Sequence, residues 1–314
     1  MKKNILITGG LGFIGFNLAK RLANNYIVYV LDIDERHKDY KNIENIHFIQ
    51  TDINNFDFIK SLLDSVEFSG IIHLAAISRV VVAQNNPKEC IRTNIEGTKT
   101  LLKALELSKT KKNNPWLIFG SSREVYGEPK KMPVKEDFEK KPINIYGESK
   151  IKGEALFTDF SKKYNNNCLI LRFSNVYGNK YDLIDRVVPK FITSIYLDKE
   201  ITIEGGEQII DFTYIDDVVK TIEKAILYLE NNTNIIDDLH ILPGIGWSLF
   251  QLIKNIENIM DKKAKIKINP KRNYDVEKFI GDPSKVKNFL NIDNFLTLEE
   301  GLQLAVKNYT KDLK

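Results

Sequence analysis

The most constraining feature of this sequence is a glycine-rich turn between an apolar run and a segment with helical apolar spacing. Residues 4–7 are typical of a buried strand and residues 16–22 of a helix, and Gly9, Gly12 and Gly15 lie between them. Such a turn suits a pyrophosphate. The first glycine allows a tight turn, the second lets backbone N–H groups approach the anion, and the third allows close helix packing at a helix N-terminus that favours negative charge. The turn therefore predicts a dinucleotide site.

A carboxylate at the end of the next apolar run bears on the choice of dinucleotide. Residues 27–31 end in Asp32, where a carboxylate can accept hydrogen bonds from an adenosine ribose. Asp32 would repel a 2′-phosphate, and Ile33 and Asp34 offer no cation, so NAD is preferred over NADP. Arg36 could reach such a phosphate, although an exposed loop arginine is more often solvated. The alternative is a structural turn with a solvated Asp32.

Tyr146 and Lys150 lie one helical turn apart, so their side chains share a face. A nearby ammonium, and the positive nicotinamide ring of an oxidised cofactor, favour the phenolate, so we expect the pKa of Tyr146 to lie below its usual value of about 10. Such a tyrosine can accept a hydroxyl proton while hydride leaves the same carbon. A Tyr/Lys pair on a helix is usually inert, and only the glycine turn gives this pair a catalytic interpretation.

Hydroxyl side chains follow the apolar run at residues 116–119. Ser122, near the switch point of a doubly wound sheet, is well placed to hydrogen-bond a reacting oxygen. With these motifs in order, the chain resembles an extended short-chain dehydrogenase/reductase of the NAD-dependent sugar-nucleotide epimerase/dehydratase family. The resemblance covers nearly the whole chain.

The resemblance implies cofactor contacts along the first half of the chain, with Asp52 and Ile53 at the adenine. The expected cofactor residues are Gly9, Gly12, Phe13, Ile14, Gly15, Asp32, Asp52, Ile53, Leu74, Ala75, Ala76, Asn94, Tyr146 and Lys150.

The resemblance also implies a nucleotide-sugar site, in which Asn175 binds the substrate's diphosphate. The expected substrate residues are Ser122, Asn175, Val188, Arg272 and Asp275. Family members commonly carry a phosphate-binding arginine where this chain has Ile210. Arg272 would then bear more of the diphosphate clamp, together with Arg186 or Lys190 if these are not merely solvated.

The residues after Ser122 bear on the reaction that the resemblance implies. Oxidation at a sugar C4 by NAD gives a 4-keto intermediate that can be re-reduced, lose water or lose carbon dioxide. Related dehydratases usually carry Thr-Asp-Glu or Thr-Ser-Glu where this chain has Ser122, Arg123 and Glu124, with the glutamate as the C5 base. Decarboxylases also carry a glutamate, and simple 4-epimerases have small residues. Glu124 is therefore either a base or one half of an ion pair with Arg123 or a lysine.

Epimerisation makes the smallest demand on the site, because it needs only Tyr146 with Lys150, Ser122, NAD and room for the ketose to turn. The leading prediction is a nucleotide-sugar 4-epimerase of the UDP-glucose/UDP-galactose type. A 4,6-dehydratase or a UDP-glucuronate decarboxylase that uses Glu124 is the alternative, and a non-catalytic dinucleotide-binding protein is a third.

The alternation of apolar runs and helical stretches predicts the architecture. Runs near residues 3–8, 27–31, 46–50, 70–74, 116–120 and 167–172 alternate with helical stretches such as 56–66, 90–108 and 146–164. This pattern is typical of a doubly wound parallel α/β sheet of the Rossmann type. With 314 residues, we expect an NAD-binding domain over residues 1–177, with segments near 208–242 returning to it. Residues 178–314 should form mainly a smaller, interleaved α/β substrate lobe.

Composition excludes several other classes. The formal charge of +4 comes from 46 basic and 42 acidic residues spread along the chain, which argues against nucleic-acid or membrane-surface binding. Two cysteines and the absence of a signal-peptide or membrane-span pattern predict a reduced, cytoplasmic setting. The four histidines lack metal-ligand spacing. The resemblance implies a homodimer built on residues 90–108 and 146–164, although their apolar stripes could equally belong to the core.

Overall fold

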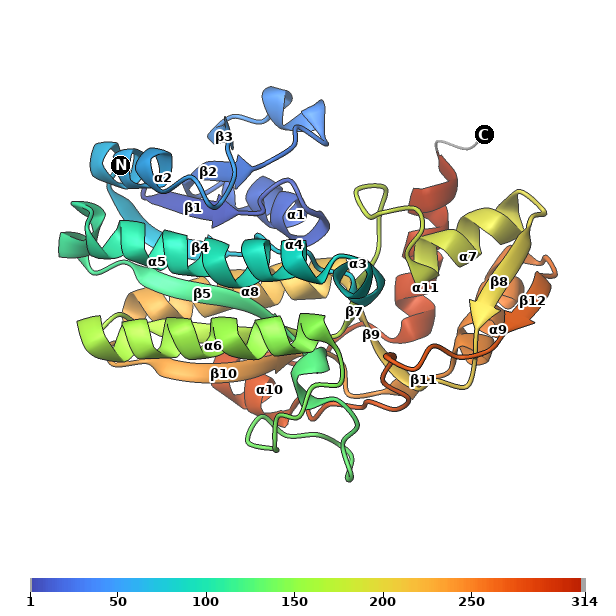
Figure 1. Ribbon diagram of the computed structural model, residues 1–314. Helices are drawn as coiled ribbons and strands as arrows, with labels where there is room; N and C mark the ends of the chain where they lie inside the picture. Colours follow the sequence, from blue (N-terminus) through green and yellow to red (C-terminus); the bar gives the residue numbers. More distant parts are fainter. Residues whose placement is uncertain (1, 312–314) are drawn as a thin grey trace.

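A parallel β-sheet forms the larger part of the protein (Figure 1), and the computed structural model describes residues 2–311. Within that range, seven strands form this sheet in the order β3-β2-β1-β4-β5-β6-β10. The strands are β1 (Asn4–Thr8), β2 (Ile27–Asp32), β3 (Ile46–Gln50), β4 (Phe68–His73), β5 (Trp116–Ser122), β6 (Cys168–Phe173) and β10 (Ile236–Ile241). The order reverses between β1 and β4, so the predicted doubly wound fold is confirmed, with its switch point beside the glycine turn.

Helices cover both faces of this sheet. One face carries α1 (Phe13–Leu22), α8 (Ile215–Asn231) and α10 (Ser284–Leu290), and the other carries α2 (Phe56–Ser65), α5 (Gly97–Glu106) and α6 (Ile145–Tyr164). Successive residues of β1 point to opposite faces, as a pleated strand requires. Ile5 and Ile7 join the core cluster beneath α1 and α8, whereas Leu6 joins the cluster beneath α2, α5 and α6.

The helical stretch predicted over residues 90–108 is not one regular helix. It consists of α4 (Pro87–Ile91), a π-helical turn (Arg92–Glu96) and α5. A Cβ atom at Gly97 would lie 2.5 Å from Ile53 Cγ2, so glycine allows α5 to approach the loop after β3 closely. The π turn precedes that contact and includes the buried Asn94. Single π turns inside helices often accompany functional sites.

The elements after β6 build a smaller region beside the large sheet. The segments β7 (Asn175–Tyr177), β9 (Ile210–Tyr214) and β11 (Gly246–Trp247) form one mixed sheet, and β8 (Glu200–Glu204) pairs in parallel with β12 (Lys265–Asn269). Around them lie α7 (Val187–Tyr196), α9 (Leu249–Met260) and α11 (Leu298–Thr310), and α3 (Val80–Asn85) lies near the junction. Of the segments near 208–242, α8 and β10 return to the large sheet, whereas β9 stays in the smaller one.

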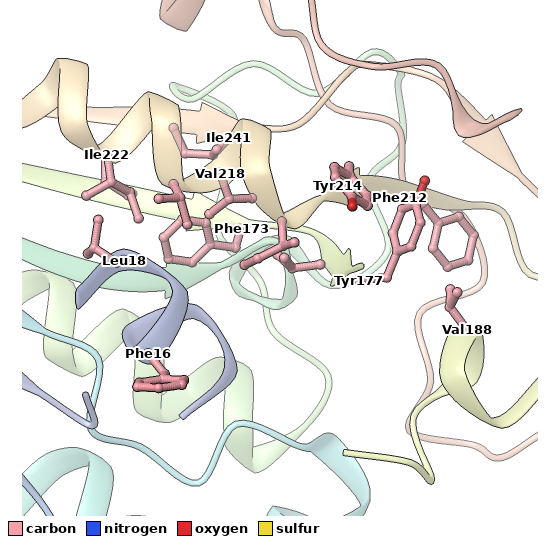
Figure 2. Close-up of a cluster of buried hydrophobic side chains, with 14 of the residues drawn as sticks. Phe16, Leu18, Phe173, Tyr177, Val188, Phe212, Tyr214, Val218, Ile222 and Ile241 are labelled. Carbon is pink, nitrogen blue, oxygen red and sulfur yellow. The ribbon is translucent and has the colours of Figure 1, made fainter. Parts of the chain in front are cut away.

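One hydrophobic core joins the two regions. Figure 2 shows side chains of α1 and α8 at one end of this core and those of β7, β9 and α7 at the other, with Phe173 of β6 between them. Phe212 and Tyr214 of β9 and Tyr177 of β7 are all buried. The elements of the two regions on either side of the site therefore share one hydrophobic core. In the described range, no helix combines the length and the apolar character needed to span a membrane.

Candidate active site

The glycine turn joins β1 to α1. Gly9 has φ +66°, and a Cβ atom there would lie 2.6 Å from the backbone nitrogen of Ala75, so this position requires glycine. At Gly15 a Cβ atom would lie 2.4 Å from the Gly9 oxygen, which shows that the third glycine packs α1 against the turn itself. At Gly12 the sole neighbour of a Cβ atom within 4 Å would be the Gly9 oxygen, at 3.1 Å. The backbone at the start of α1 is thus open toward the adjacent cavity.

Asp32 stands at the end of β2 and ties this strand to the turn. Its Oδ2 accepts from the backbone N–H of Leu11 (2.9 Å) and its Oδ1 from that of Ile33 (2.8 Å). Burial raises the pKa of Asp32, and these hydrogen bonds and the charge of Arg36 oppose that rise. Each carboxylate oxygen retains a lone pair for a ribose hydroxyl. Arg36 forms an ion pair with Asp34 at 3.6 Å.

A cavity of about 660 Å³ opens above the glycine turn at the carboxyl ends of the strands. Its volume lies within the range of small-molecule sites. The expected cofactor residues that line it are Gly9, Gly12, Phe13, Ile14, Gly15, Asp32, Asp52, Ile53, Leu74, Ala75, Ala76, Tyr146 and Lys150. The open backbone at Gly12 fits a pyrophosphate, and the Asp32 carboxylate fits a ribose.

Asn94 differs from the other expected cofactor residues because it does not line this cavity. Its Oδ1 accepts from the backbone N–H of Ile77 (2.8 Å), and its Nδ2 donates to Ser149 Oγ (2.9 Å) and to the Ile77 oxygen (3.2 Å). Its amide is therefore satisfied inside the protein. Ile77 does line the cavity, so Asn94 supports the cavity wall from behind. The structure thus places Asn94 behind the lining residues, where a direct contact with the cofactor was expected.

Tyr146 lies in the first turn of α6, and the Ser122 side chain lies close enough to its hydroxyl to lower its pKa. The helix starts here because Asn144 caps it, accepting from the backbone N–H of Gly147 through Oδ1 (2.9 Å). Lys150 follows one turn later, with its Nζ 5.7 Å from the centre of the Tyr146 ring and donating to the Gly120 oxygen at 2.7 Å. The predicted common face of Tyr146 and Lys150 is therefore confirmed.

The lowered pKa expected for Tyr146 depends in part on the positive charge of the oxidised cofactor, and in the protein by itself the shift has the opposite direction. Burial raises the pKa of Tyr146 to about 12, against the opposing effects of the Ser122 hydrogen bond and the charge of Arg186. Burial also lowers the pKa of Lys150 to about 8. Removal from water favours the neutral form of both groups, and Lys150 directs its donor to a carbonyl. Phenolate formation at Tyr146 therefore requires additional positive charge in the cavity.

A second cavity, of about 360 Å³, adjoins the first and extends toward the smaller region. Tyr146, Ser121 and Arg186 border both cavities, so Tyr146 stands where their contents would meet. The predicted substrate residues that line the second cavity are Ser122, Asn175, Val188, Arg272 and Asp275, and Glu124 lines it as well. Among the described residues, no group of three or more His, Cys, Asp or Glu side chains is placed to hold a metal ion.

The cations in this cavity differ in how fully they are neutralised. Arg272 is paired with Asp275 at 2.7 Å, and Arg186 lies 3.5 Å from Asp182. Lys190 donates from Nζ to the Thr202 oxygen at 3.1 Å, and within residues 2–311 it forms no ion pair with an acidic side chain. Among the described lining residues, Lys190 is therefore the cation with most of its charge left for an anionic ligand.

Glu124 is held in an ion pair. Its Oε1 lies 3.0 Å from Arg123 Nη2, with the two side chains 8% and 9% exposed, respectively. Its Oε2 accepts from Asn144 Nδ2 at 2.8 Å. Of the two sequence interpretations of Glu124, the structure has the ion pair with Arg123. Sequence reasoning missed the role of Asn144, although an asparagine directly before a helical run is a capping signal.

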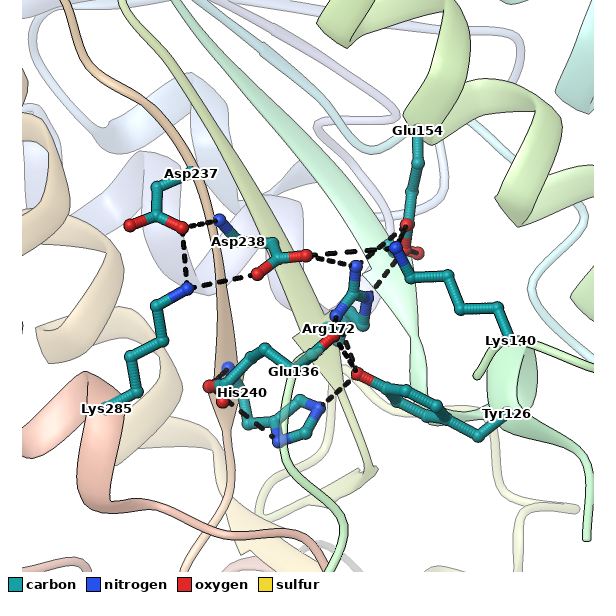
Figure 3. Close-up of polar contacts among 10 residues, drawn as sticks. Tyr126, Glu136, Lys140, Glu154, Arg172, Asp237, Asp238, His240 and Lys285 are labelled. Atoms are coloured by element: carbon teal, nitrogen blue, oxygen red, sulfur yellow. Dashed lines mark hydrogen bonds and ion pairs between the residues drawn. The ribbon is translucent and has the colours of Figure 1, made fainter. Parts of the chain in front are cut away.

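A buried polar network surrounds Arg172 near the carboxyl end of β5 (Figure 3). Arg172 of β6, 1% exposed, donates to the Glu154 carboxylate from Nε (2.8 Å) and Nη2 (2.9 Å), and from Nη1 to the Tyr126 hydroxyl (2.6 Å). Arg172 Nη2 also pairs with Asp238, and Ser121 Oγ donates to Glu154 Oε1 at 2.6 Å. The network thus fixes the end of β5 against α6, β6 and β10. Sequence reasoning missed it.

With this geometry in view, comparison with known proteins identifies the family. The family model described as GDP-mannose 4,6 dehydratase matches residues 6–305. The chain belongs to the NAD-dependent epimerase/dehydratase family. The predicted membership of this extended short-chain dehydrogenase/reductase family is thereby confirmed.

Proteins of this family match almost the whole length of the chain. The UDP-glucuronate 4-epimerase of Thermodesulfobacterium geofontis is 31% identical over 98% of this chain and 96% of that protein. The crystal structure of the UDP-glucose 4-epimerase of Thermotoga maritima with UDP-glucose is 32% identical, with a TM-score of 0.90 over 99% of this chain and all of that one. The UDP-glucuronic acid 4-epimerase of Bacillus cereus, solved with UDP-glucuronic acid and NAD, is 30% identical, with a TM-score of 0.87 over the same shares.

Proposed function

We propose that this family member is an NAD-dependent nucleotide-sugar 4-epimerase of the UDP-glucose/UDP-galactose type. The observation that carries this proposal is the ion pair between Arg123 and Glu124, because it occupies the carboxylate that a dehydratase or a decarboxylase would need as a base. Tyr146, at the junction of the cavities, and Ser122, in the substrate cavity, are side chains that epimerisation requires. The two solved relatives with bound UDP-sugars are both 4-epimerases by name and support the same proposal.

In this proposal the first cavity holds NAD, which accepts a hydride from the sugar C4 and returns it. Because Tyr146 borders both cavities, it is placed to take the proton of the C4 hydroxyl and later to give it back. Ser122 lines the substrate cavity beside Tyr146 and orients the same oxygen. Asn175, Arg272 and Lys190 bind the diphosphate and leave the sugar free to turn between the two reductions.

Product analysis tests the proposed reaction. The purified protein is incubated with UDP-glucose, UDP-glucuronate, dTDP-glucose and GDP-mannose in turn, and we expect the C4 epimer of UDP-glucose. A 4-keto-6-deoxy sugar or a pentose would instead show a 4,6-dehydratase or a decarboxylase that uses Glu124. That alternative has one observation in its favour, since Glu124 lines the substrate cavity. If none of the four is converted, the remaining interpretation is a dinucleotide-binding protein without turnover.

Replacing Asp32 with alanine is expected to raise the affinity for NADP relative to NAD, because the repulsion of a 2′-phosphate is removed. Fluorescence titration of both cofactors measures the ratio of the two dissociation constants. Asp34→Ala is the matched control, since this neighbouring carboxylate is 63% exposed and pairs with Arg36. An unchanged ratio in Asp32→Ala would show that Asp32 does not contact the ribose.

The purified protein is expected to retain NAD, because an epimerase returns the hydride that it takes and has no need to release the cofactor. Heat denaturation followed by analysis of the supernatant should yield NAD or NADH in near-stoichiometric amount. A supernatant without either, combined with weak affinity for added NAD, contradicts a self-recycling reaction.

We also propose a cytoplasmic homodimer built on α5 and α6. The buried stripes of these helices belong to the core, as Leu101 and Phe157 do, so the contact would use their outward faces, which carry charges of both signs, such as Lys103 and Asp159. Mass measurement at micromolar concentration should give a dimer that weakens as salt rises. A monomer under all these conditions refutes the dimer. Cys90 and Cys168 are buried and free, which suits a reducing compartment.

A further inference from the structure

We infer that Arg123 is a specificity-determining residue, which keeps the reaction at epimerisation by holding Glu124 in an ion pair. This inference rests on the proposed function, since it concerns the fate of a 4-keto sugar in the second cavity. Arg123 acts through Glu124 and is therefore a positioning residue.

A free carboxylate in this cavity could remove the C5 proton of a 4-keto sugar and so divert the reaction from epimerisation. Oxidation at C4 acidifies the neighbouring C5–H bond, because the electron pair of that bond can move toward the C4 oxygen as an enolate. A carboxylate near C5 takes the proton and becomes a carboxylic acid that exchanges with solvent. The enolate then either regains a proton at C5 or eliminates the C6 hydroxyl, which takes a proton from that acid and leaves as water while a C5–C6 double bond forms. An epimerase must therefore keep its carboxylates occupied while the ketone is present.

Glu124 is the carboxylate that this argument concerns. It lines the substrate cavity together with Ser122 and Tyr146, and it follows Ser122 by two residues. Both of its oxygens already have donors, with Arg123 Nη2 at 3.0 Å from Oε1 and Asn144 Nδ2 at 2.8 Å from Oε2. A proton taken from C5 would neutralise Glu124 and so cancel its ion pair with Arg123 in a buried site, where ion pairs are poorly screened by salt.

Arg123 is itself held in place from two sides. Its Nε donates to Asn175 Oδ1 at 3.4 Å, and its guanidinium carbon lies 5.6 Å from the centre of the Phe279 ring. Its Nη1 is buried and has no hydrogen-bond partner among the described residues. A buried donor without a partner destabilises a protein, so stability alone does not explain an arginine here. The contact of Arg123 with Glu124 provides a functional explanation for an arginine at this position.

Deuterium incorporation separates this role from a merely structural one. The wild-type protein and the variants R123Q, R123K and R123Q/E124Q are incubated with UDP-glucose in deuterated water, and proton NMR measures the loss of the C5 hydrogen per turnover at C4. The wild type should exchange no C5 hydrogen. R123Q removes the charge and shortens the side chain, and we expect exchange per turnover to rise by at least about tenfold, a modest part of what a general base can contribute. R123K retains a cation and should stay near the wild type. The double variant should lose the exchange gained by R123Q.

Three results would overturn the inference alone. One is an R123Q variant that still epimerises without C5 exchange. Another is exchange that persists undiminished in R123Q/E124Q, because Glu124 would then not be the base. The third is a wild-type epimerase that exchanges C5 at its turnover rate, and this measurement does not depend on the folding of any variant. A wild-type protein that converts UDP-glucose into a 4-keto-6-deoxy sugar would instead overturn the proposed function together with the inference.

Discussion

Replacing Tyr146 with phenylalanine is expected to lower turnover of a UDP-sugar by about 100- to 10,000-fold, the usual contribution of a positioned acid/base group. The change removes one hydroxyl and leaves the ring in its buried site between the two cavities. The free energy of unfolding should therefore change little. Steady-state kinetics on the substrate that the wild type converts measures the effect.

Tyr164→Phe is the matched control, because Tyr164 lies on the same helix α6 and its hydroxyl contacts Glu106 away from both cavities. It should retain wild-type turnover. Lys150→Ala should also lose orders of magnitude, since the Lys150 ammonium anchors to Gly120 beside Tyr146. Ser122→Ala should lose less, because it removes one hydrogen bond. Full activity in Tyr146→Phe would contradict the proposed acid/base role.

Replacing Arg172 with leucine is expected to destabilise the protein by about 3–5 kcal/mol, the usual effect of removing one partner from a buried ion pair. Among the described residues, Ser121 and the partly exposed Lys140 would then be the only partners left for the buried Glu154 carboxylate. Urea unfolding followed by circular dichroism measures the change. Replacing Glu154 by leucine as well should restore part of the loss, because no uncompensated carboxylate remains on α6.

Lys60→Ala is the control for that measurement. Lys60 and Asp64 form an ion pair one turn apart on α2, with their side chains 35% and 27% exposed. Surface pairs of this kind contribute about 0–1 kcal/mol. An Arg172→Leu variant as stable as Lys60→Ala would show that water or local movement compensates the buried network.

Local patterns were sufficient to predict the features that depend on neighbours in sequence. The positive φ of Gly9, the close packing of Gly15 and the place of Asp32 at the end of β2 follow from spacing and residue type. Six of the seven strands of the large sheet follow from the alternation of apolar runs and helical stretches, and the seventh, β10, lies in the segments near 208–242 that were expected to return to it. Tyr146 and Lys150 share a face because four residues make about one helical turn.

The remaining features depend on contacts between distant segments. Asn144 reaches Glu124 across 20 positions, and Arg172 meets Asp238 across 66, so neither contact leaves a local pattern. The raised pKa of Tyr146 reflects burial, which a helical spacing cannot reveal. Likewise, β9 has the apolar character of a strand of the large sheet, and only its tertiary neighbours β7 and β11 assign it elsewhere.

The hydrophobic core that runs from α1 and α8 to β9 and α7 has a consequence for how ligands enter (Figure 2). Two rigid bodies joined by a hinge can swing apart only if little apolar surface lies between them. Here Phe173, Tyr177 and Phe212 fill that boundary, so such a swing would bring buried aromatic rings into water. Ligand exchange must therefore rely on rearrangement of surface loops, and the two regions should melt together in a single cooperative transition.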